Sequence, residues 1–142
     1  MKGSSIYSHI LIPLENSCVD NVILTHIRPL ARLTNARITF VHVADGFMAR
    51  NQKDLGESEE MRDDYQYLKR LELEFQKDGF EVKAILLYGE PSKEILALAE
   101  KEQCDLIAMA THGHRFLSDI ILGSVASEVR HNTRIPVLQI RG

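Results

Sequence analysis

Two glycines and a serine late in the chain have the types and the spacing to hold a phosphate group. Gly113 and Gly123 are separated by nine residues, and Ser124 directly follows the second glycine. Glycine lets a backbone turn sharply and come close to a ligand. A Gly-Ser pair at the start of a helix offers free N–H groups and a hydroxyl to an anion. The stretch from Ala110 to Ser124 therefore predicts a phosphate cradle.

The polar and aromatic residues inside this stretch leave more than one interpretation open. His112 and His114 suit metal or acid–base chemistry, but no carboxylate partner is identifiable, so histidines that face solvent or bond to nearby backbone are favoured. Arg115 either binds a phosphate through two parallel hydrogen bonds or covers loop carbonyls. Phe116 either packs beneath the loop, which is favoured, or stacks on a base.

The composition is typical of one ordinary globular domain. The chain has 142 residues, of which 44% are hydrophobic and 26% charged, and its net charge is −3. We therefore expect a single domain over residues 1–142. No overall basic field attracts nucleic acid or an anionic membrane, and no apolar run approaches the roughly 20 residues that span a bilayer. The N-terminal residues do not resemble a signal-peptide core, so the expected location is cytoplasmic.

The two cysteines are not expected to form a structural cross-link. Cys18 and Cys104 are far apart and do not form a CxxC pair. Reduced thiols are expected, with Cys104 partly buried and Cys18 accessible.

The apolar pattern predicts five strands that alternate with four helices. The strands are expected at His9–Leu14, Arg37–Val43, Glu81–Tyr88, Cys104–Ala110 and Ile135–Ile140. The helices are expected from a cap at Ser17 or Asp20 to about Leu33, then over Glu59–Asp78, Pro91–Lys101 and Ser124–Asn132.

Several residues refine these boundaries. Pro29 is expected to kink the first helix or end its regular part, and Gly79 is expected to stop the second. Ala44–Ser58 lacks any period and predicts a loop. Met61, Tyr65, Leu68, Leu71 and Phe75 are expected to form the apolar face of the second helix.

This alternation predicts an α/β fold with a parallel, doubly wound, five-stranded sheet. With strand order 3-2-1-4-5, the switch point lies between the first and fourth strands, and ligands bind beyond the carboxyl ends of the strands there. Pro13–Asn16 and Ala110–Gly113 should then lie side by side. The topology thus supports the phosphate cradle independently of the glycines.

Four features occur together in this chain: the Ile-Leu-Ile-Pro-Leu-Glu run, His42-Val43, Gly89-Glu90-Pro91 and the glycine pattern. Through them, and over essentially its whole length, the chain resembles the universal stress protein family. The nucleotide-binding members have Gly-x2-Gly-x9-Gly-Ser/Thr, which Gly113, Gly123 and Ser124 match. The chain departs from the family at Ala110 in place of the first glycine, at Glu15 in place of aspartate, and at His114-Arg115-Phe116 in place of Arg-x-Gly.

The resemblance implies a dimeric protein that binds ATP and is tied to stress tolerance. Pro13 and Val43 would line the adenine and ribose region, 110–116 would wrap the sugar and phosphates, and 124–126 would hold phosphate oxygens. Backbone N–H groups and a helix dipole can neutralise a polyphosphate without a lysine, and Mg²⁺ or Mn²⁺ would bridge the phosphates. The expected ligand contacts are Pro13, Leu14, Glu15, Val43, Met109, Ala110, Thr111, His112, Gly113, His114, Arg115, Phe116, Gly123, Ser124, Val125 and Ala126.

Two of the departures leave alternatives open. If position 110 needs a positive φ, alanine costs roughly 1–2 kcal/mol, whereas a strand-like backbone there leaves only a methyl that crowds the ligand. A micromolar ligand binds with about 8 kcal/mol, so ATP binding is expected to survive either effect. Glu15 is either an exposed turn residue, which is slightly favoured, or a contact for ribose hydroxyls or a metal.

The chain has no pattern that predicts a reaction. A nucleophile elbow, paired carboxylates, a Walker lysine and a water-activating base are all missing from the sequence, so a nucleotide sensor is expected, with at most slow ATP hydrolysis. One rival is a family member that has lost nucleotide binding and acts as a dimeric interaction module. A flavodoxin-like or response-regulator domain is a weaker rival. The apolar run Ile135–Arg141 would leave an open sheet edge, and antiparallel pairing across a two-fold axis would make a homodimer.

Overall fold

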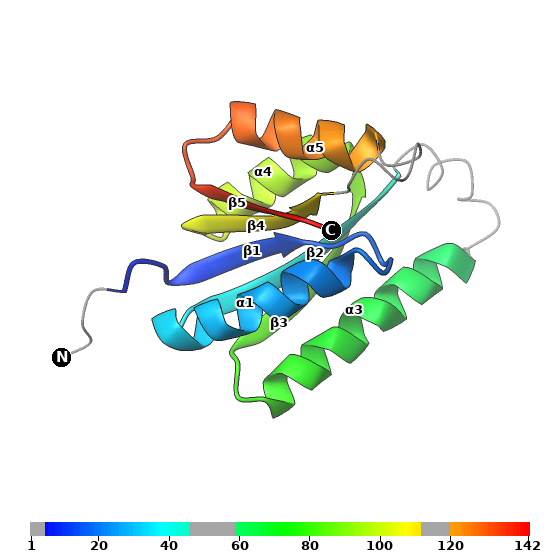
Figure 1. The fold of residues 1–142 in the computed structure, drawn as a ribbon. Coiled ribbons are helices and arrows are strands. Elements are labelled where there is room, and N and C mark those ends of the chain that lie inside the picture. Colours follow the sequence, from blue (N-terminus) through cyan, green and yellow to red (C-terminus); the bar gives the residue numbers. More distant parts are fainter. Residues whose placement is uncertain (1–4, 46–58, 112–119) are drawn as a thin grey trace.

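A five-stranded parallel sheet forms the centre of the protein (Figure 1). The computed structural model describes residues 5–45, 59–111 and 120–142. The strands are β1 (His9–Pro13), β2 (Arg37–Asp45), β3 (Val82–Gly89), β4 (Leu106–Thr111) and β5 (Val137–Arg141). Their order is β3-β2-β1-β4-β5 and all four pairings are parallel. The predicted strand order and fold class are confirmed.

Two layers of helices cover the sheet. Helices α1 (Asp20–Thr34) and α3 (Glu59–Lys77) lie on one face, and α4 (Pro91–Lys101) and α5 (Ile120–His131) lie on the other (Figure 1). Within the described ranges, no helix is long and apolar enough to cross a lipid bilayer. The arrangement directs the helix N-termini that follow β1, β3 and β4 to the carboxyl edge of the sheet.

The core consists of two apolar clusters, one on each face of the sheet. Ile10 and Ile12 of β1 point into the cluster beneath α1 and α3, while Leu11 between them points into the cluster beneath α4 and α5. This alternation follows from the two-residue period of a strand. Because both faces are covered, β1 reads as a continuous apolar run, as the sequence predicts for a central parallel strand.

The prediction for α1 needs two corrections. The helix continues past Pro29 to Thr34. Proline has no N–H group to donate to the carbonyl of Thr25, four residues earlier. Both Pro29 and Thr25 are exposed, so water can bond to that carbonyl instead. The spacing of Ile27, Ala31 and Leu33 in the sequence predicts one apolar face, but Leu33 is 84% exposed, because Ile27 and Ala31 define an inner stripe that Leu33 misses by about half a turn.

The prediction for α3 is correct in its extent and wrong at one position of its inner face. Leu68, Leu71 and Phe75 are buried, whereas Tyr65 is 52% exposed. Asp64 takes the buried place instead. Gly79 has φ +90° and follows the helix, as expected for a residue that ends it.

The last third of the chain differs from the prediction mainly at element boundaries. Strand β4 begins at Leu106 rather than Cys104, since Gln103 adopts a left-handed conformation and delays it. Helix α5 begins at Ile120, four residues before the predicted start at Ser124. Strand β5 covers Val137–Arg141 and lies at the edge of the sheet, with Pro136 just before it. Cys104 is buried and Cys18 exposed, as predicted.

Candidate functional site

The switch point of the sheet lies between β1 and β4, where Ile10 pairs with Leu106. At the carboxyl edge, the N–H of Gly142 donates to the carbonyl of Thr111 at 2.8 Å. A Cβ on Gly142 would lie 3.0 Å from a methyl of Val19, at the start of α1. The end of β4, the C-terminus and the segment between β1 and α1 therefore meet at this edge, as the predicted topology requires.

The core brings several of the predicted site residues together. Met109, Val125 and Ala126 belong to the cluster beneath α4 and α5, and Val43 packs at its border. Leu14 and Ala110 belong to the cluster on the opposite face. Pro13, Glu15 and Thr111 are half-buried at the carboxyl edge. The prediction for His112, Gly113, His114, Arg115 and Phe116 lies outside the described residues.

Ala110 occupies an ordinary strand position. It is part of β4, pairs with Ile140 and is 3% exposed. Its φ is not positive, since the only described non-glycine residues with positive φ are Asn16, Asn35 and Gln103. Of the two alternatives, the backbone penalty does not apply. The methyl belongs to the core cluster that also contains Val19, so it is not displayed at the surface.

The start of α5 changes the expected role of Ser124. Because the helix begins at Ile120, Gly123 and Ser124 lie at the end of its first turn rather than before it. The N–H groups without intrahelical partners belong to the turn that precedes Ser124. Ser124 is exposed, so its hydroxyl is accessible to a ligand at this edge, beside the partial positive charge of the helix N-terminus.

Asp20 takes up the backbone donors of the segment between β1 and α1. Its carboxylate accepts the N–H groups of Glu15 at 3.1 Å, Asn16 at 2.9 Å and Ser17 at 3.4 Å. The N–H of Leu14 donates to the carbonyl of Val41 at 2.8 Å. Four consecutive backbone donors are thus used inside the protein, and this segment has none of them left for a phosphate.

A tyrosine completes the surroundings of Asp20. The hydroxyl of Tyr67 in α3 donates to the Asp20 carboxylate at 2.6 Å. Burial raises the pKa of Asp20, whose side chain is 2% exposed, and the hydrogen bonds from Tyr67 and the backbone oppose that rise. Burial and the same contact raise the pKa of the Tyr67 hydroxyl. The prediction that Ser17 or Asp20 caps α1 is wrong: the N-cap is Val19, without a side-chain cap hydrogen bond, and Asp20 is the first helical residue and reaches back to the preceding segment.

A second polar set joins α3 to the same segment. The Asn16 amide donates to the carboxylates of Asp63 and Asp64, each at 2.9 Å. Nε2 of His42 lies 3.2 Å from the other oxygen of Asp64, and its Nδ1 lies 2.7 Å from the carbonyl oxygen of Leu14. Asn16 has φ +64°, a conformation that asparagine tolerates better than most residues.

Sequence reasoning missed this network. Asp64 and Tyr67 lie on a strongly charged helix, where acidic and aromatic residues ordinarily face water. Asn16 provided the one signal, since asparagine after a strand favours a left-handed turn. Within the described ranges, no three His, Cys, Asp or Glu side chains are placed to hold a metal ion together.

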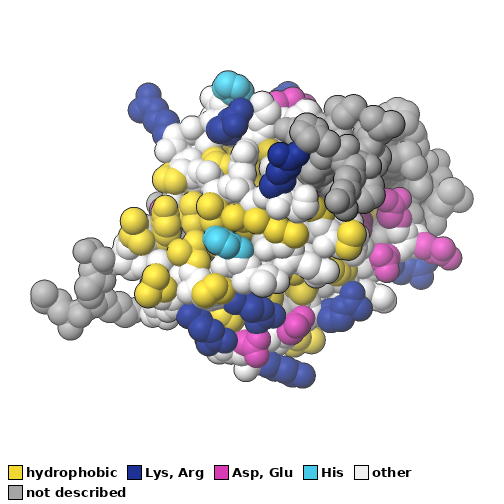
Figure 2. Space-filling model, viewed as in Figure 1, with side chains coloured by type: hydrophobic (Ala, Val, Ile, Leu, Met, Phe, Trp, Pro, Cys, Tyr) yellow, Lys and Arg dark blue, Asp and Glu magenta, His cyan; other side chains and the backbone are white. Residues whose placement is uncertain are grey.

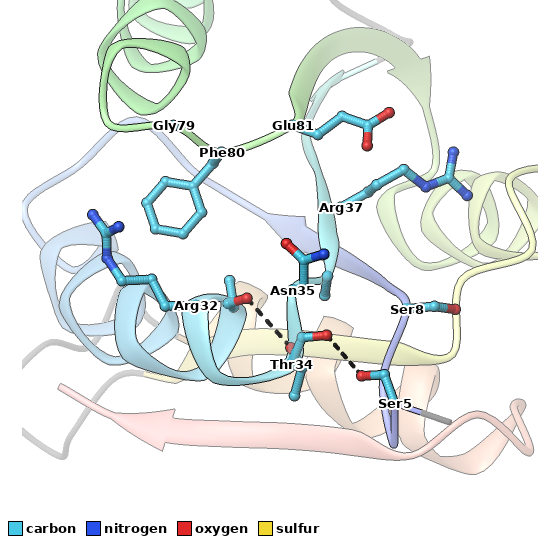
Figure 3. Close-up of a pocket in the computed structure, with 11 residues that line it drawn as sticks. Ser5, Ser8, Arg32, Thr34, Asn35, Arg37, Gly79, Phe80 and Glu81 are labelled. Carbon is cyan, nitrogen blue, oxygen red and sulfur yellow. Dashed lines mark hydrogen bonds between the residues drawn. The ribbon is translucent and has the colours of Figure 1, made fainter. Parts of the chain in front are cut away.

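A cavity of about 900 Å³ lies at the opposite, amino edge of the sheet (Figure 3). Arg32, Asn35, Arg37 and Phe80 are among its lining residues, and the Arg32 guanidinium lies 4.6 Å from the centre of the Phe80 ring. Helices α1 and α3 both end beside it, and helix C-termini carry partial negative charge. Arg32, in the last turn of α1, counters that charge. The lining thus combines two arginines and one acidic residue with two helix C-termini, whereas, among the described helices, N-termini lie only at the carboxyl edge, where their N–H groups suit phosphate oxygens.

The strand order and the helices on both faces define a doubly wound α/β protein whose switch point lies between β1 and β4. The family model of the universal stress protein family matches residues 6–141. Universal stress protein MJ0531 of Methanocaldococcus jannaschii is 31% identical over 98% of this chain and 85% of its own. The chain therefore belongs to the universal stress protein family.

Two solved structures support the same assignment at the level of the fold. Universal stress protein MJ0577 of Methanocaldococcus jannaschii is 29% identical over 97% of both chains. Its structure superposes with a TM-score of 0.82 at 28% identity, over 96% of this chain and 97% of that one. The universal stress protein of Archaeoglobus fulgidus in complex with dAMP superposes with a TM-score of 0.70 at 23% identity, over 95% and 98%.

Proposed function

We propose that the protein binds an adenine nucleotide, ATP with a bridging Mg²⁺ or Mn²⁺, at the carboxyl edge of the sheet. It then acts in the cytoplasm as a nucleotide-dependent regulator of the stress response rather than as an enzyme. The dAMP in the Archaeoglobus fulgidus relative supports an adenine nucleotide as the ligand class. The metal would be held by phosphate oxygens and water, as Mg²⁺ commonly is.

The observation that carries the proposal is the distribution of donors at this edge. The backbone donors of Leu14 to Ser17 are consumed by Val41 and Asp20. With these donors already used, that side of the site suits the hydroxyl and amino groups of a nucleoside, which can themselves donate hydrogen bonds. The first turn of α5 has N–H groups without partners inside the helix, and Ser124 is exposed; both features suit phosphate oxygens.

This distribution gives the nucleotide a direction. The half-buried apolar side chains of Pro13 and Val43 would flank the base. Glu15 would face the ribose, and the phosphates would extend toward α5 and the stretch that contains Gly113. The direction differs from that of folds in which the first segment after β1 holds the phosphates.

Isothermal titration calorimetry with Mg-ATP tests the proposal. We expect a micromolar dissociation constant, and about fivefold weaker binding for Ser124→Ala because a hydrogen bond to a charged phosphate is lost. Ser127→Ala, one turn further along α5, is the matched control and should bind as the wild type does. An absence of heat at millimolar Mg-ATP contradicts the proposal and favours the alternative, a dimeric interaction module that has lost nucleotide binding.

We also propose that the protein is a homodimer through the C-terminal run Ile135–Arg141. Among the described strands, β5 pairs only with β4, so its other edge has no strand neighbour within residues 5–45, 59–111 and 120–142. Val137, Leu138 and Ile140 are only half-buried, and Figure 2 shows hydrophobic side chains across the face that contains β5 and α1. Antiparallel pairing of two β5 strands would remove the open edge.

A single proline tests the dimer without disturbing the β4–β5 ladder. The carbonyl of Pro136 and the N–H of Gly142 both bond to β4, so the backbone of Gln139, an odd number of residues from each, faces away from β4. Gln139→Pro removes that outward donor, and we expect a monomer in light scattering at tens of micromolar. Gln139→Ala keeps the donor and should remain a dimer. A wild-type protein of monomeric mass contradicts the proposal.

A further inference from the structure

We propose that Asp64, in the second turn of α3, is a positioning residue that holds the nucleoside side of the site in its binding conformation. The inference rests on the proposed function, because it concerns the same nucleotide. Asp64 does not contact the ligand in this account. It acts through His42 and Asn16, which contact or flank the predicted nucleoside contacts Leu14, Glu15 and Val43.

The Asp64 carboxylate divides its two oxygens between two different segments. Oδ1 accepts the amide of Asn16 at 2.9 Å, and Oδ2 lies 3.2 Å from Nε2 of His42. The two members of the ion pair are largely shielded, with side-chain exposures of 15% for His42 and 9% for Asp64. One carboxylate thus ties the segment after β1 to the end of β2.

The hydrogen-bond partners orient the ring of His42. A carbonyl oxygen only accepts, so Nδ1 carries the proton that it donates to Leu14 at 2.7 Å. This contact turns Nε2 toward Asp64, and the largely shielded ring has the Asp64 carboxylate as the partner of its second nitrogen.

The network fixes the backbone that a nucleoside would meet. His42 holds the Leu14 carbonyl and directly precedes Val43 in β2. Asn16, held by Asp64 and Asp63 in its left-handed conformation, directly follows Glu15. Asp64 therefore links the two segments that carry Leu14, Glu15 and Val43, in addition to the backbone bonds that Val41 and Asp20 accept.

The test separates the nucleoside part of the ligand from its phosphates. Asp64→Asn keeps the shape of the side chain and removes its charge. We expect adenosine and Mg-ATP to bind about tenfold more weakly, by the same factor, and inorganic tripolyphosphate to bind within twofold of the wild type. A merely structural role would lower the melting temperature without separating adenosine from tripolyphosphate.

Asp105→Asn is the matched control, because Asp105 also holds backbone N–H groups of the chain but lies at the amino edge. It should lose thermal stability and keep the wild-type affinity for adenosine. Should Asp64→Asn fail to fold, Asn16→Ala removes one branch of the network, and about threefold weaker adenosine binding is expected.

The outcomes distinguish this inference from the proposed function. A wild-type protein that binds neither adenosine nor Mg-ATP overturns the proposed function and this inference with it. A wild type that binds both, with an Asp64→Asn or Asn16→Ala variant that binds adenosine within twofold of it, overturns the positioning role alone. An equal loss for tripolyphosphate also overturns it, since the effect would not be confined to the nucleoside side.

Discussion

At each end of β1 an aspartate accepts hydrogen bonds from backbone N–H groups, and the two aspartates differ in how deeply they are buried. At the carboxyl edge, Asp20 is 2% exposed and accepts three backbone N–H groups and the Tyr67 hydroxyl. At the amino edge, Asp105 is half-buried and accepts the N–H groups of Ser8 and His9 and the Ser8 hydroxyl. Similar bonds are therefore made in two different electrostatic settings.

The difference appears in the two pKa values. Burial raises the pKa of Asp20 beyond what its hydrogen bonds offset. Burial also acts to raise the pKa of Asp105, but the hydrogen bonds from His9 and Ser8 outweigh it and lower the pKa. Asp20 is thus a buried carboxylate beside the candidate site, whereas Asp105 is a half-buried carboxylate at the opposite edge of the sheet. The amino edge has helix C-termini with arginines beside them, whereas the carboxyl edge has helix N-termini, whose partial positive charge favours an anionic ligand.

The largest expected effect on stability comes from removing the buried Asp20 carboxylate. Asp20→Ala leaves three backbone donors and the Tyr67 hydroxyl without their acceptor, and we expect a loss of about 3 kcal/mol in the free energy of unfolding. Urea denaturation measures it. Tyr67→Phe, which removes one donor and leaves the carboxylate, should cost about 1 kcal/mol. A loss below about 1 kcal/mol for Asp20→Ala would mean that the two edges do not differ as described.

A smaller effect on stability is expected at Asp105, the half-buried aspartate at the amino edge. Asp105→Asn replaces an ionised acceptor by an amide, and we expect a loss of about 1–2 kcal/mol in unfolding free energy at pH 7. Because the folded pKa of Asp105 is lowered, its contribution is present above the unfolded pKa near 3.8 and disappears as the pH falls through the folded value. The wild-type and variant curves should converge in acid. Curves that stay parallel down to the lowest pH at which the protein is folded would contradict this.

The smallest expected effect concerns His9, beside Asp105. His9 is 2% exposed; Nε2 bonds to the Thr39 hydroxyl at 2.7 Å, and Nδ1 bonds to the Glu102 carbonyl. Burial, with a contribution from Arg37, lowers its pKa from 6.5. Below pH 6.5 the unfolded chain takes up the proton more readily, so stability falls as the pH falls.

The substitution His9→Gln isolates the contribution that the protonation of His9 makes to the pH dependence of stability. The stability advantage of the wild type over the variant, measured by urea unfolding, should be constant above pH 7 and shrink steadily below pH 6.5. An advantage that grows in mild acid would show that the buried ring gains rather than loses its proton affinity on folding.

Much of the fold could be predicted because it follows from local patterns. The continuous apolar run of β1, the spacing of Leu68, Leu71 and Phe75, and Gly79 after α3 each predict their element from a few neighbouring residues. The parallel, doubly wound sheet follows from the alternation of strands and helices, and the 3-2-1-4-5 order expected for it, which sets the switch point, is confirmed.

The site was less accessible to prediction because its polar groups meet through tertiary contacts. Asp64 lies 48 positions from Asn16, and Tyr67 lies 47 from Asp20. No helical or strand period relates residues so distant, and the burial of Asp64 at the expense of Tyr65 depends on His42 from another strand. The start of α5 at Ile120 likewise differs from the start predicted from the Gly-Ser pair alone.

The central claim is that a nucleotide binds at the carboxyl edge and not in the cavity of about 900 Å³ at the amino edge. Amide chemical shifts of the ¹⁵N-labelled protein, titrated with Mg-ATP, test it directly. We expect saturable shifts at Leu14–Ser17, Val43, Thr111 and Ser124–Ala126, with Arg32–Arg37 and Gly79–Glu81 unchanged. Shifts confined to Arg32–Arg37 and Gly79–Glu81, or an unchanged spectrum at millimolar Mg-ATP, would contradict it.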